Sequence, residues 1–170
     1  MVIWLIGMSG SGKTTLGKYL YEKLKPVHKN LIFLDGDVIR EIMGNDLGHT
    51  IEDRRKNAHR ITRLCKFLDS HGINVICAVL SIFPESHEWN RANIKDYYEV
   101  YLEVPFETLS QRDPKGYYKK ALKGEITNFV GVDIKFPPPK DPHMTISNNG
   151  SLEGLYKSGD KLIHVIEERL

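Results

Sequence analysis

The run Gly-Met-Ser-Gly-Ser-Gly-Lys-Thr at residues 7–14 constrains the fold more than any other feature of the chain. An apolar stretch of strand length, residues 2–6, precedes it, and a helical pattern begins at Lys13. The spacing matches Gly-x-x-x-x-Gly-Lys-Ser/Thr at every defined position, the phosphate-binding loop (P-loop) that joins a strand to a helix. The chain is therefore predicted to begin with a buried strand, a phosphate-binding turn and a helix.

The remainder of the chain continues this alternation of strands and helices. Short β-rich runs are followed by longer helical patterns, which predicts parallel strands joined by right-handed crossovers. The runs are mostly apolar on both faces, as in a sheet that helices cover on each side. We expect an α/β fold with a doubly wound parallel β-sheet, whose ligands bind beyond the carboxyl ends of the strands. Strands are expected near 2–6, 31–35, 73–80, 98–104 and 143–147, and helices near 13–25, 52–70, 86–95, 105–111 and 152–169.

Length and charge limit the organisation and the partners of the chain. Its 170 residues predict a single P-loop domain over 1–170. Lys and Arg total 24 against 22 for Asp and Glu, so we expect neither a nucleic-acid polymer nor a membrane surface as partner. The apolar stretches are too short to cross a bilayer, which favours a cytoplasmic protein. Cys65 and Cys77 lack metal-ligand spacing and are expected to be reduced core residues.

The P-loop motif predicts how a triphosphate is held. Backbone N–H groups of the glycine-rich turn surround the β-phosphate, and the helix that follows adds a favourable dipole. Lys13 is expected to reach the β- and γ-phosphate oxygens, and Thr14 to offer its hydroxyl to Mg²⁺, so ATP with Mg²⁺ is the expected cofactor pair. The candidate ATP-binding residues are Gly7, Ser9, Gly10, Ser11, Gly12, Lys13, Thr14, Thr15 and Arg112.

Two carboxylates flank a glycine in Asp35-Gly36-Asp37, at the end of the second expected strand. One of them can hold Mg²⁺ and the other can accept the proton of an attacking hydroxyl. Asp37 is the preferred base, Asp35 is the next candidate and an expected Mg²⁺ ligand with Thr14, and Lys13 completes the expected catalytic set. The alternative is a turn in which Asp37 caps the following helix.

Residues 112–136 interrupt the alternation with a basic, proline-containing and glycine-containing stretch. Lys115 and the pair Lys119-Lys120 gather there, which predicts a mobile lid over the phosphate site. The alternative is a solvated surface excursion.

Several further blocks resemble the adenylylsulfate (APS) kinase family. They are Asp35-Gly36-Asp37-Val38-Ile39-Arg40, Asp46-Leu47-Gly48-His49, Glu52-Asp53-Arg54-Arg55-Lys56-Asn57, Asp113-Pro114-Lys115-Gly116-Tyr117-Tyr118-Lys119-Lys120-Ala121 and Phe129-Val130-Gly131-Val132-Asp133. With the P-loop, they cover residues 2 to about 147 in the family's order and at similar spacing.

The resemblance implies ATP-dependent phosphorylation of the 3′-hydroxyl of a nucleotide that bears an activated acid. In most members the acceptor is adenylyl sulfate, which becomes 3′-phosphoadenylyl sulfate. The acceptor-binding residues that the resemblance implies are Asp37, Arg40, His49, Arg54, Asn57, Ser81, Lys115, Lys119 and Phe129. The oligomeric state stays open, with a homodimer among the states to be tested.

Two departures from the family pattern lie on the acceptor side. The family usually reads Leu-Gly-Phe where this chain has Leu47-Gly48-His49. It usually reads Ser-Pro-Tyr-Arg where this chain has Ser81-Ile82-Phe83-Pro84. Adenylyl sulfate is the default acceptor. The alternative is cytidine diphosphoramidate, the acceptor of related kinases in bacterial capsule pathways, whose N–H donors Glu85 or His87 could accept. A kinase of another small metabolite or nucleotide on the same fold is a further alternative. We expect His49 and residues 81–87 to decide the choice.

Overall fold

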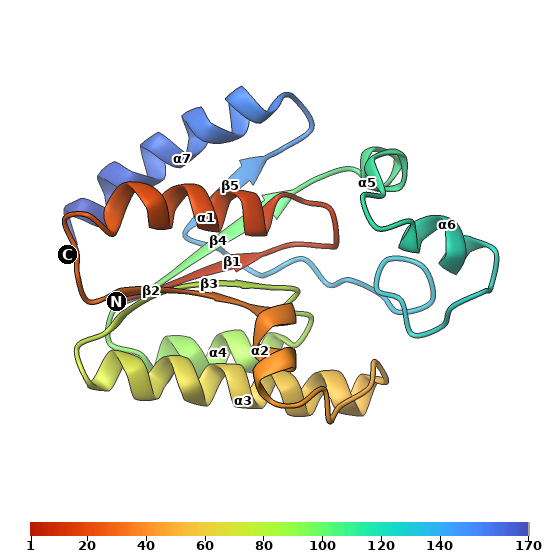
Figure 1. The fold of residues 1–170 in the computed structure, drawn as a ribbon, viewed down its shortest axis with the longest axis horizontal. Helices are drawn as coiled ribbons and strands as arrows, with labels where there is room; N and C mark the ends of the chain where they lie inside the picture. Colours follow the sequence, from red (N-terminus) through yellow and green to blue (C-terminus); the bar gives the residue numbers. More distant parts are fainter. Residues whose placement is uncertain (170) are drawn as a thin grey trace.

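The computed structural model describes residues 1–169 and contains a five-stranded, fully parallel β-sheet between two layers of helices (Figure 1). The strand order is β2-β3-β1-β4-β5, so the first strand lies in the centre and successive crossovers leave it in both directions. This confirms the predicted doubly wound α/β fold. The strands are β1 (Val2–Ile6), β2 (Leu31–Asp35), β3 (Asn74–Val79), β4 (Tyr97–Glu103) and β5 (Met144–Ser147). The helices are α1 (Lys13–Leu24), α2 (Gly36–Ile42), α3 (Ile51–Ser70), α4 (Pro84–Asn93), α5 (Phe106–Arg112), α6 (Tyr117–Leu122) and α7 (Leu152–Glu167).

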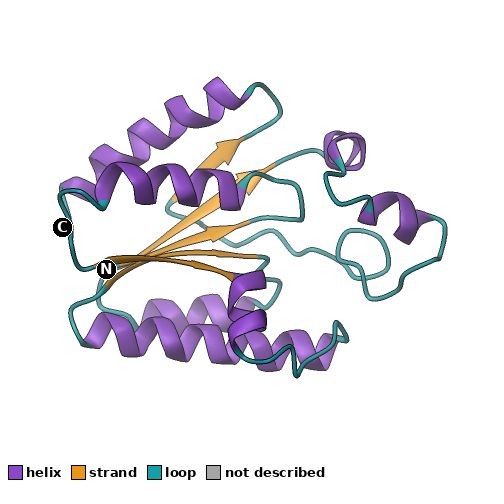
Figure 2. Cartoon of the chain, in the orientation of Figure 1, coloured by secondary structure: helices purple, strands orange, loops and turns teal. Residues whose placement is uncertain are grey.

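Each face of the sheet carries its own apolar core. Alternate residues of β1 point to opposite faces, as the pleat requires. Ile3 and Leu5 pack with α1 and α7, whereas Trp4 and Ile6 pack with α3. Figure 2 shows the two helical layers on either side of the strands. Cys65 and Cys77 are unpaired and buried, as predicted.

Two smaller apolar clusters lie outside these cores, and both include residues from the predicted lid. Ile82 and Phe83 pack with Val130, and Tyr118 packs with Val104 and Leu109. Helices α5 and α6 extend beyond the carboxyl ends of the central strands (Figure 1). The lid is therefore anchored at the edge of the sheet where the sequence predicts the ligands.

The structure differs from the sequence prediction in two short helices, α2 and α6. The cap of α2 is Asp35, whose side chain accepts a hydrogen bond from the backbone N–H of Asp37. The alternative in which Asp37 is the cap was wrong, because Asp37 already belongs to the first turn. Helix α6 begins after Gly116, which adopts a left-handed backbone. Within residues 1–169, no helix is long and apolar enough to span a membrane, and the cytoplasmic location remains a prediction.

Candidate functional site

The P-loop lies between β1 and α1 and is fixed from both sides. Gly10 and Gly12 have φ angles of 76° and 96°, which side chains disfavour. A Cβ on Gly7 would lie 2.9 Å from the carbonyl oxygen of Leu102, so only glycine fits against β4. The loop thus needs its glycines to turn backbone N–H groups toward a phosphate.

A residue that the sequence analysis missed supports the same loop. The buried Asn148, which directly follows β5, donates a hydrogen bond from Nδ2 to the carbonyl oxygen of Ser11 at 2.9 Å. Ser11 itself is buried. Only the position of Asn148 after a strand could have indicated its role, because 137 residues separate the two partners.

Lys13 begins α1, and its ammonium lies inside the loop. Its Nζ donates to the carbonyl oxygen of Met8 at 2.7 Å. Desolvation lowers the pKa of Lys13 to about 8, although the charges of Asp35 and Asp37 act in the opposite direction. An ammonium that is poorly solvated gains more from an incoming phosphate than an exposed one does.

Asp35 connects the P-loop helix to α2. Thr14 donates a hydrogen bond from Oγ1 to Asp35 Oδ2 at 2.6 Å, and Asp35 Oδ1 accepts from the backbone of Asp37 at 2.9 Å. A hydroxyl and a carboxylate oxygen thus lie side by side beyond β2. Oxygen ligands of this kind suit Mg²⁺, which commonly keeps several waters in such sites.

Asp37 projects from the first turn of α2 and pairs with the lid. Its Oδ2 accepts from Lys115 Nζ at 2.7 Å, and both side chains are more than half exposed. Partial burial alone would raise the pKa of Asp37, but the hydrogen bond from Lys115 and the charges of Lys115, Lys13 and Arg40 lower it below its ordinary value. Asp37 is therefore an ionised carboxylate that can accept a proton.

Arg40 and Arg54 hold the segment that contains His49. Arg40 donates to the carbonyl oxygens of Leu47 and Gly48, and Arg54 donates to the carbonyl oxygens of His49 and Asn128. Burial, followed by the charges of Arg54 and Arg40, lowers the pKa of His49, so its imidazole is neutral at pH 7. The two arginines thus connect α2, α3, the segment between them and the lid.

Asn57 belongs to α3 and Phe129 to the lid. Asn57 of α3 is 7% exposed, and its Oδ1 has no hydrogen-bond partner among the described residues. Phe129 packs edge-to-face on Tyr118, with ring centroids 4.9 Å apart. Tyr118 in turn donates to the carbonyl oxygen of Ser9 at 2.8 Å, which connects the lid to the P-loop. A buried acceptor without a partner is costly unless a ligand or water completes it.

The structure shows few side-chain contacts for three other predicted site residues, Arg112, Thr15 and Lys119. Arg112, at the end of α5, donates to the carbonyl oxygen of Gly150 at 3.3 Å. Thr15 is an exposed residue of α1. The backbone N–H of Lys119 bonds to Asp113, and within residues 1–169 its ammonium makes no hydrogen bond or ion pair.

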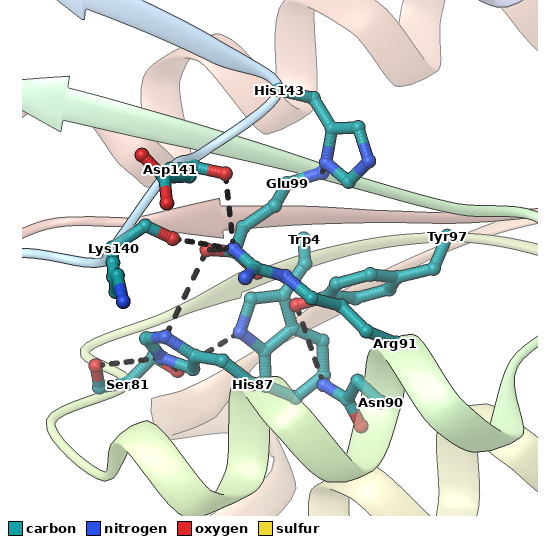
Figure 3. Close-up of polar contacts among 10 residues, drawn as sticks. All are labelled: Trp4, Ser81, His87, Asn90, Arg91, Tyr97, Glu99, Lys140, Asp141 and His143. Atoms are coloured by element: carbon teal, nitrogen blue, oxygen red, sulfur yellow. Dashed lines mark hydrogen bonds and ion pairs between the residues drawn. The ribbon is translucent and has the colours of Figure 1, made fainter.

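Ser81 follows β3, and its hydroxyl contacts Trp4 and the ring of His87 (Figure 3). Its Oγ accepts from Trp4 Nε1 at 2.9 Å and lies 2.7 Å from His87 Nε2. Its φ angle of 53° lies in the left-handed region, which is strained for serine. Glu85 forms an ion pair with Arg55 instead.

His87 is buried against a carboxylate that has no exposed surface. Its Nδ1 lies 3.8 Å from Glu99 Oε1, which also accepts from Arg91 at 3.0 Å. Burial lowers the pKa of His87 below its ordinary value, against the opposing charge of Glu99. Figure 3 shows Ser81, His87 and Glu99 in one connected group that includes Arg91. Ser81 and His87 belong to the segment 81–87 that the sequence analysis singled out, whereas Arg91 of α4 and Glu99 of β4 were not predicted.

A family model described as adenylylsulphate kinase matches residues 1–147. The chain belongs to the adenylylsulfate kinase family. A cytidine diphosphoramidate kinase of Campylobacter jejuni is 48% identical over 151 residues, which cover 87% of this chain and 86% of the relative. An adenylyl-sulfate kinase of Gloeothece citriformis is 38% identical, covering 99% and 94% of the two chains.

The solved structures agree with this family. An APS kinase of Mycobacterium tuberculosis, determined in complex with AMPPNP and APS, superposes with a TM-score of 0.85 at 29% identity over 98% of this chain and 96% of the other. As a member of the adenylylsulfate kinase family, the protein is an ATP-using phosphotransferase with an alcohol acceptor. The family prediction made from the sequence is confirmed.

Proposed function

We propose that this adenylylsulfate kinase family member phosphorylates the 3′-hydroxyl of a cytidine nucleotide that ends in a phosphoramidate. The observation that carries the acceptor choice is the environment of Ser81, which is bound to His87 and has no arginine in the three residues that follow it. The relative at 48% identity is a cytidine diphosphoramidate kinase, which supports the same acceptor.

The donor side supplies the residues for ATP. The P-loop N–H groups hold the β-phosphate, and Lys13 moves from the Met8 carbonyl to the phosphate oxygens as the triphosphate arrives. Thr14 and Asp35 are the residues that would hold Mg²⁺, which supplies positive charge for the transferring phosphoryl group. The remaining proposed donor residues are Gly7, Ser9, Gly10, Ser11, Gly12, Thr15 and Arg112.

Asp37 is the proposed base. It is ionised, exposed and directly beside the residues that hold the phosphates, so it can accept the proton of the acceptor hydroxyl. Lys115 must leave this carboxylate or turn with it toward the phosphates when the acceptor enters. Asp35 is less suited to this role, because Thr14 and the α2 backbone already occupy both of its oxygens.

Arg40, Arg54, Asn57 and Phe129 support a nucleotide acceptor in general. Arginine forks bind phosphoryl oxygens, and the unpartnered Asn57 carboxamide can bind a sugar or base. His49 stands where the family has a phenylalanine, and a pyrimidine needs less stacking surface than adenine. The smaller imidazole therefore favours the cytidine acceptor.

Adenylyl sulfate, which the sequence ranks first, is the second candidate. It is favoured by the family model and by the retained set Arg40, Arg54, Asn57 and Phe129. Both candidates share the reaction and the donor site, so they differ only in the contacts to the base and to the terminal group.

Lid closure is part of the proposal. Residues 112–136 should close when both ligands are present, since phosphoryl transfer to a hydroxyl competes with transfer to water. Amide exchange in this segment should slow only with nucleotide and acceptor together.

A single domain over 1–170 and a homodimer are further proposals. Limited proteolysis would test the domain organisation, and analytical ultracentrifugation would test the oligomeric state.

The deciding experiment measures ADP release with ATP, Mg²⁺ and each acceptor in turn. We expect a higher kcat/KM with cytidine diphosphoramidate than with adenylyl sulfate. The reverse order would favour the second candidate. Activity with neither nucleotide would contradict the acceptor assignment and leave the donor site to be tested with other alcohols.

A further inference from the structure

Two backbone carbonyl groups of the P-loop, those of Ser9 and Ser11, are each bound by a side chain from a distant part of the chain. Tyr118 of α6 donates its hydroxyl proton to the carbonyl oxygen of Ser9 at 2.8 Å. Asn148, which follows β5, donates from Nδ2 to the carbonyl oxygen of Ser11 at 2.9 Å. The lid and the end of the sheet thus each hold one peptide group of the loop.

The residue after each of these serines is a glycine with a left-handed backbone. The φ angle is 76° at Gly10 and 96° at Gly12. Glycine adopts positive and negative φ about equally readily, so the peptide group before a glycine can flip at little cost. A flip would exchange the directions of its C=O and its N–H. Tyr118 and Asn148 oppose such a flip, because each would lose the carbonyl oxygen that it binds.

The directions of the two C=O groups fix those of the N–H groups that follow. Both peptide groups are trans, so the N–H of each lies opposite its C=O. Ser11 and Asn148 are buried, so the N–H of Gly12 points away from the protein interior. Tyr118 is buried in an apolar cluster, so the N–H of Gly10 points away from that cluster. Both glycines are partly exposed, and within residues 1–169 neither N–H binds a backbone carbonyl.

Both supporting side chains are fixed as donors. Burial raises the pKa of Tyr118 to about 12, so its hydroxyl keeps its proton at neutral pH. A carbonyl oxygen can only accept, which assigns the NH₂ group of Asn148 to the side that faces the loop. The backbone N–H of Asn148 also donates to the carbonyl oxygen of Glu103 in β4 at 2.9 Å. A Cβ on Gly12 would lie 2.6 Å from Asn148 Nδ2, so the absence of a side chain there makes room for the carboxamide.

We propose that Tyr118 and Asn148 are positioning residues that aim the N–H groups of Gly10 and Gly12 at the phosphates of the bound nucleotide. Donors that already point at the site of an anion bind it without the cost of turning the backbone. These roles rest on the proposed donor site for their ligand, and they do not depend on which acceptor is used. They give α6 a part in ATP binding that precedes closure of the lid.

Removing either donor should weaken the binding of nucleotide. Tyr118→Phe keeps the buried ring and loses only the hydroxyl, whereas Asn148→Ala loses the carboxamide. Calorimetry with ADP and Mg²⁺ should show a dissociation constant that rises by about threefold to tenfold in each variant, the range expected for one hydrogen bond. In steady-state kinetics the loss should appear in the KM for ATP more than in kcat, because these contacts are made in the ground state and in the transition state alike.

Each variant has a neighbouring residue of the same type as its control. Tyr117 is 42% exposed and Asn149 is exposed, so Tyr117→Phe and Asn149→Ala should leave the dissociation constant within about twofold of the wild type. Thermal unfolding shows whether each variant is folded. If Asn148→Ala is not, Asn148→Asp keeps the shape without the donor, with Asn149→Asp as its control for charge. Wild-type affinity in Tyr118→Phe and in the Asn148 variant would overturn the proposal.

Amide spectra separate a positioning role from a general loosening of the loop. In the wild type, ADP with Mg²⁺ should move the ¹H resonances of Gly10 and Gly12 to lower field, because a hydrogen bond to an anion deshields the proton. Tyr118→Phe should reduce this shift more at Gly10, and Asn148→Ala should reduce it more at Gly12. Equal reductions at both glycines would overturn the proposed roles. A wild type that binds no ADP would overturn the donor site as well, whereas normal binding by the wild type and both variants would overturn these roles alone.

Discussion

The proposed donor half and the proposed acceptor half of the site differ in how their polar groups are satisfied. In the donor half, the P-loop is bound within the protein, since Lys13 donates to Met8 and Asn148 holds Ser11. In the acceptor half, Asn57 Oδ1 has no hydrogen-bond partner within residues 1–169, and Asp37 is bound to a lysine of the lid. A site for ATP, which every acceptor shares, binds more tightly when it is formed in advance. A site that must distinguish between acceptors needs polar groups whose hydrogen bonds only the right ligand completes.

This difference separates two kinds of mutation. Changes on the donor side should reduce the rate with every acceptor by the same factor. Changes on the acceptor side should alter the ratio between acceptors more than the overall rate.

Lys13→Ala should produce the largest effect, a loss in kcat of roughly 10³-fold with both acceptors, because the lysine stabilises charge on the transferring phosphoryl group. Steady-state kinetics and thermal unfolding together check this. A folded variant with near-normal activity would contradict the kinase assignment of the loop.

Asp37→Asn should lower kcat by roughly 10²-fold and change the acceptor KM less, since a general base acts mainly in the transition state. Asp35→Asn is the comparison variant, and it should affect the Mg²⁺ dependence of the rate instead. An unchanged kcat in Asp37→Asn would transfer the role of base to Asp35.

Exchanging His49 and residues 81–84 for the family's residues should shift the preference between acceptors without changing the binding of ATP. His49→Phe, combined with Ser-Pro-Tyr-Arg in place of Ser81-Ile82-Phe83-Pro84, should move kcat/KM toward adenylyl sulfate by at least about tenfold, because the new side chains suit adenine and sulfate better than cytosine and phosphoramidate. The ATP KM serves as the control and should remain constant. An equal loss with both acceptors would mean that the segment does not select.

Lys115→Met should produce the smallest effect on the base, which is read from the pH profile. The pKa of Asp37 is lowered in the folded protein, so the ionised base is lost as pH falls through that lowered value. Without Lys115, the pKa of Asp37 rises and the acid limb of kcat/KM moves to higher pH. Because the pair is exposed, the shift should be about half a pH unit. No movement of the limb would show that Asp37 is not the group that titrates.

Local patterns allowed most of the fold and the position of the P-loop between β1 and α1 to be predicted from the sequence. The strands, the longer helices and the P-loop each depend on residues that are close together in the chain. Helices α2 and α6 were missed because they are 7 and 6 residues long and follow turns rich in glycine and charge. Short helices of this kind are stabilised by tertiary packing more than by their own sequence.

The contacts that support the acceptor site could not be read from the sequence. Ser81 and Trp4 are 77 residues apart, and Asn128 and Arg54 are 74 apart. Nothing in the residue types fixes which of many serines or backbone oxygens such a donor meets. The sequence suggested that Glu85 or His87 contacts the acceptor. In the structure His87 is buried and Glu85 is paired with Arg55, contacts that the residue types alone do not indicate.

The two small apolar clusters beneath the lid have a consequence for how this family can diversify. Ile82, Phe83 and Val130 form one cluster, which shares Phe136 with the core on the α3 side, and Val104, Leu109 and Tyr118 form the other. A substitution in such a cluster disturbs few neighbours, so its stability cost stays local. New acceptor preferences could therefore accumulate through neutral steps, while the sheet and the P-loop are inherited unchanged.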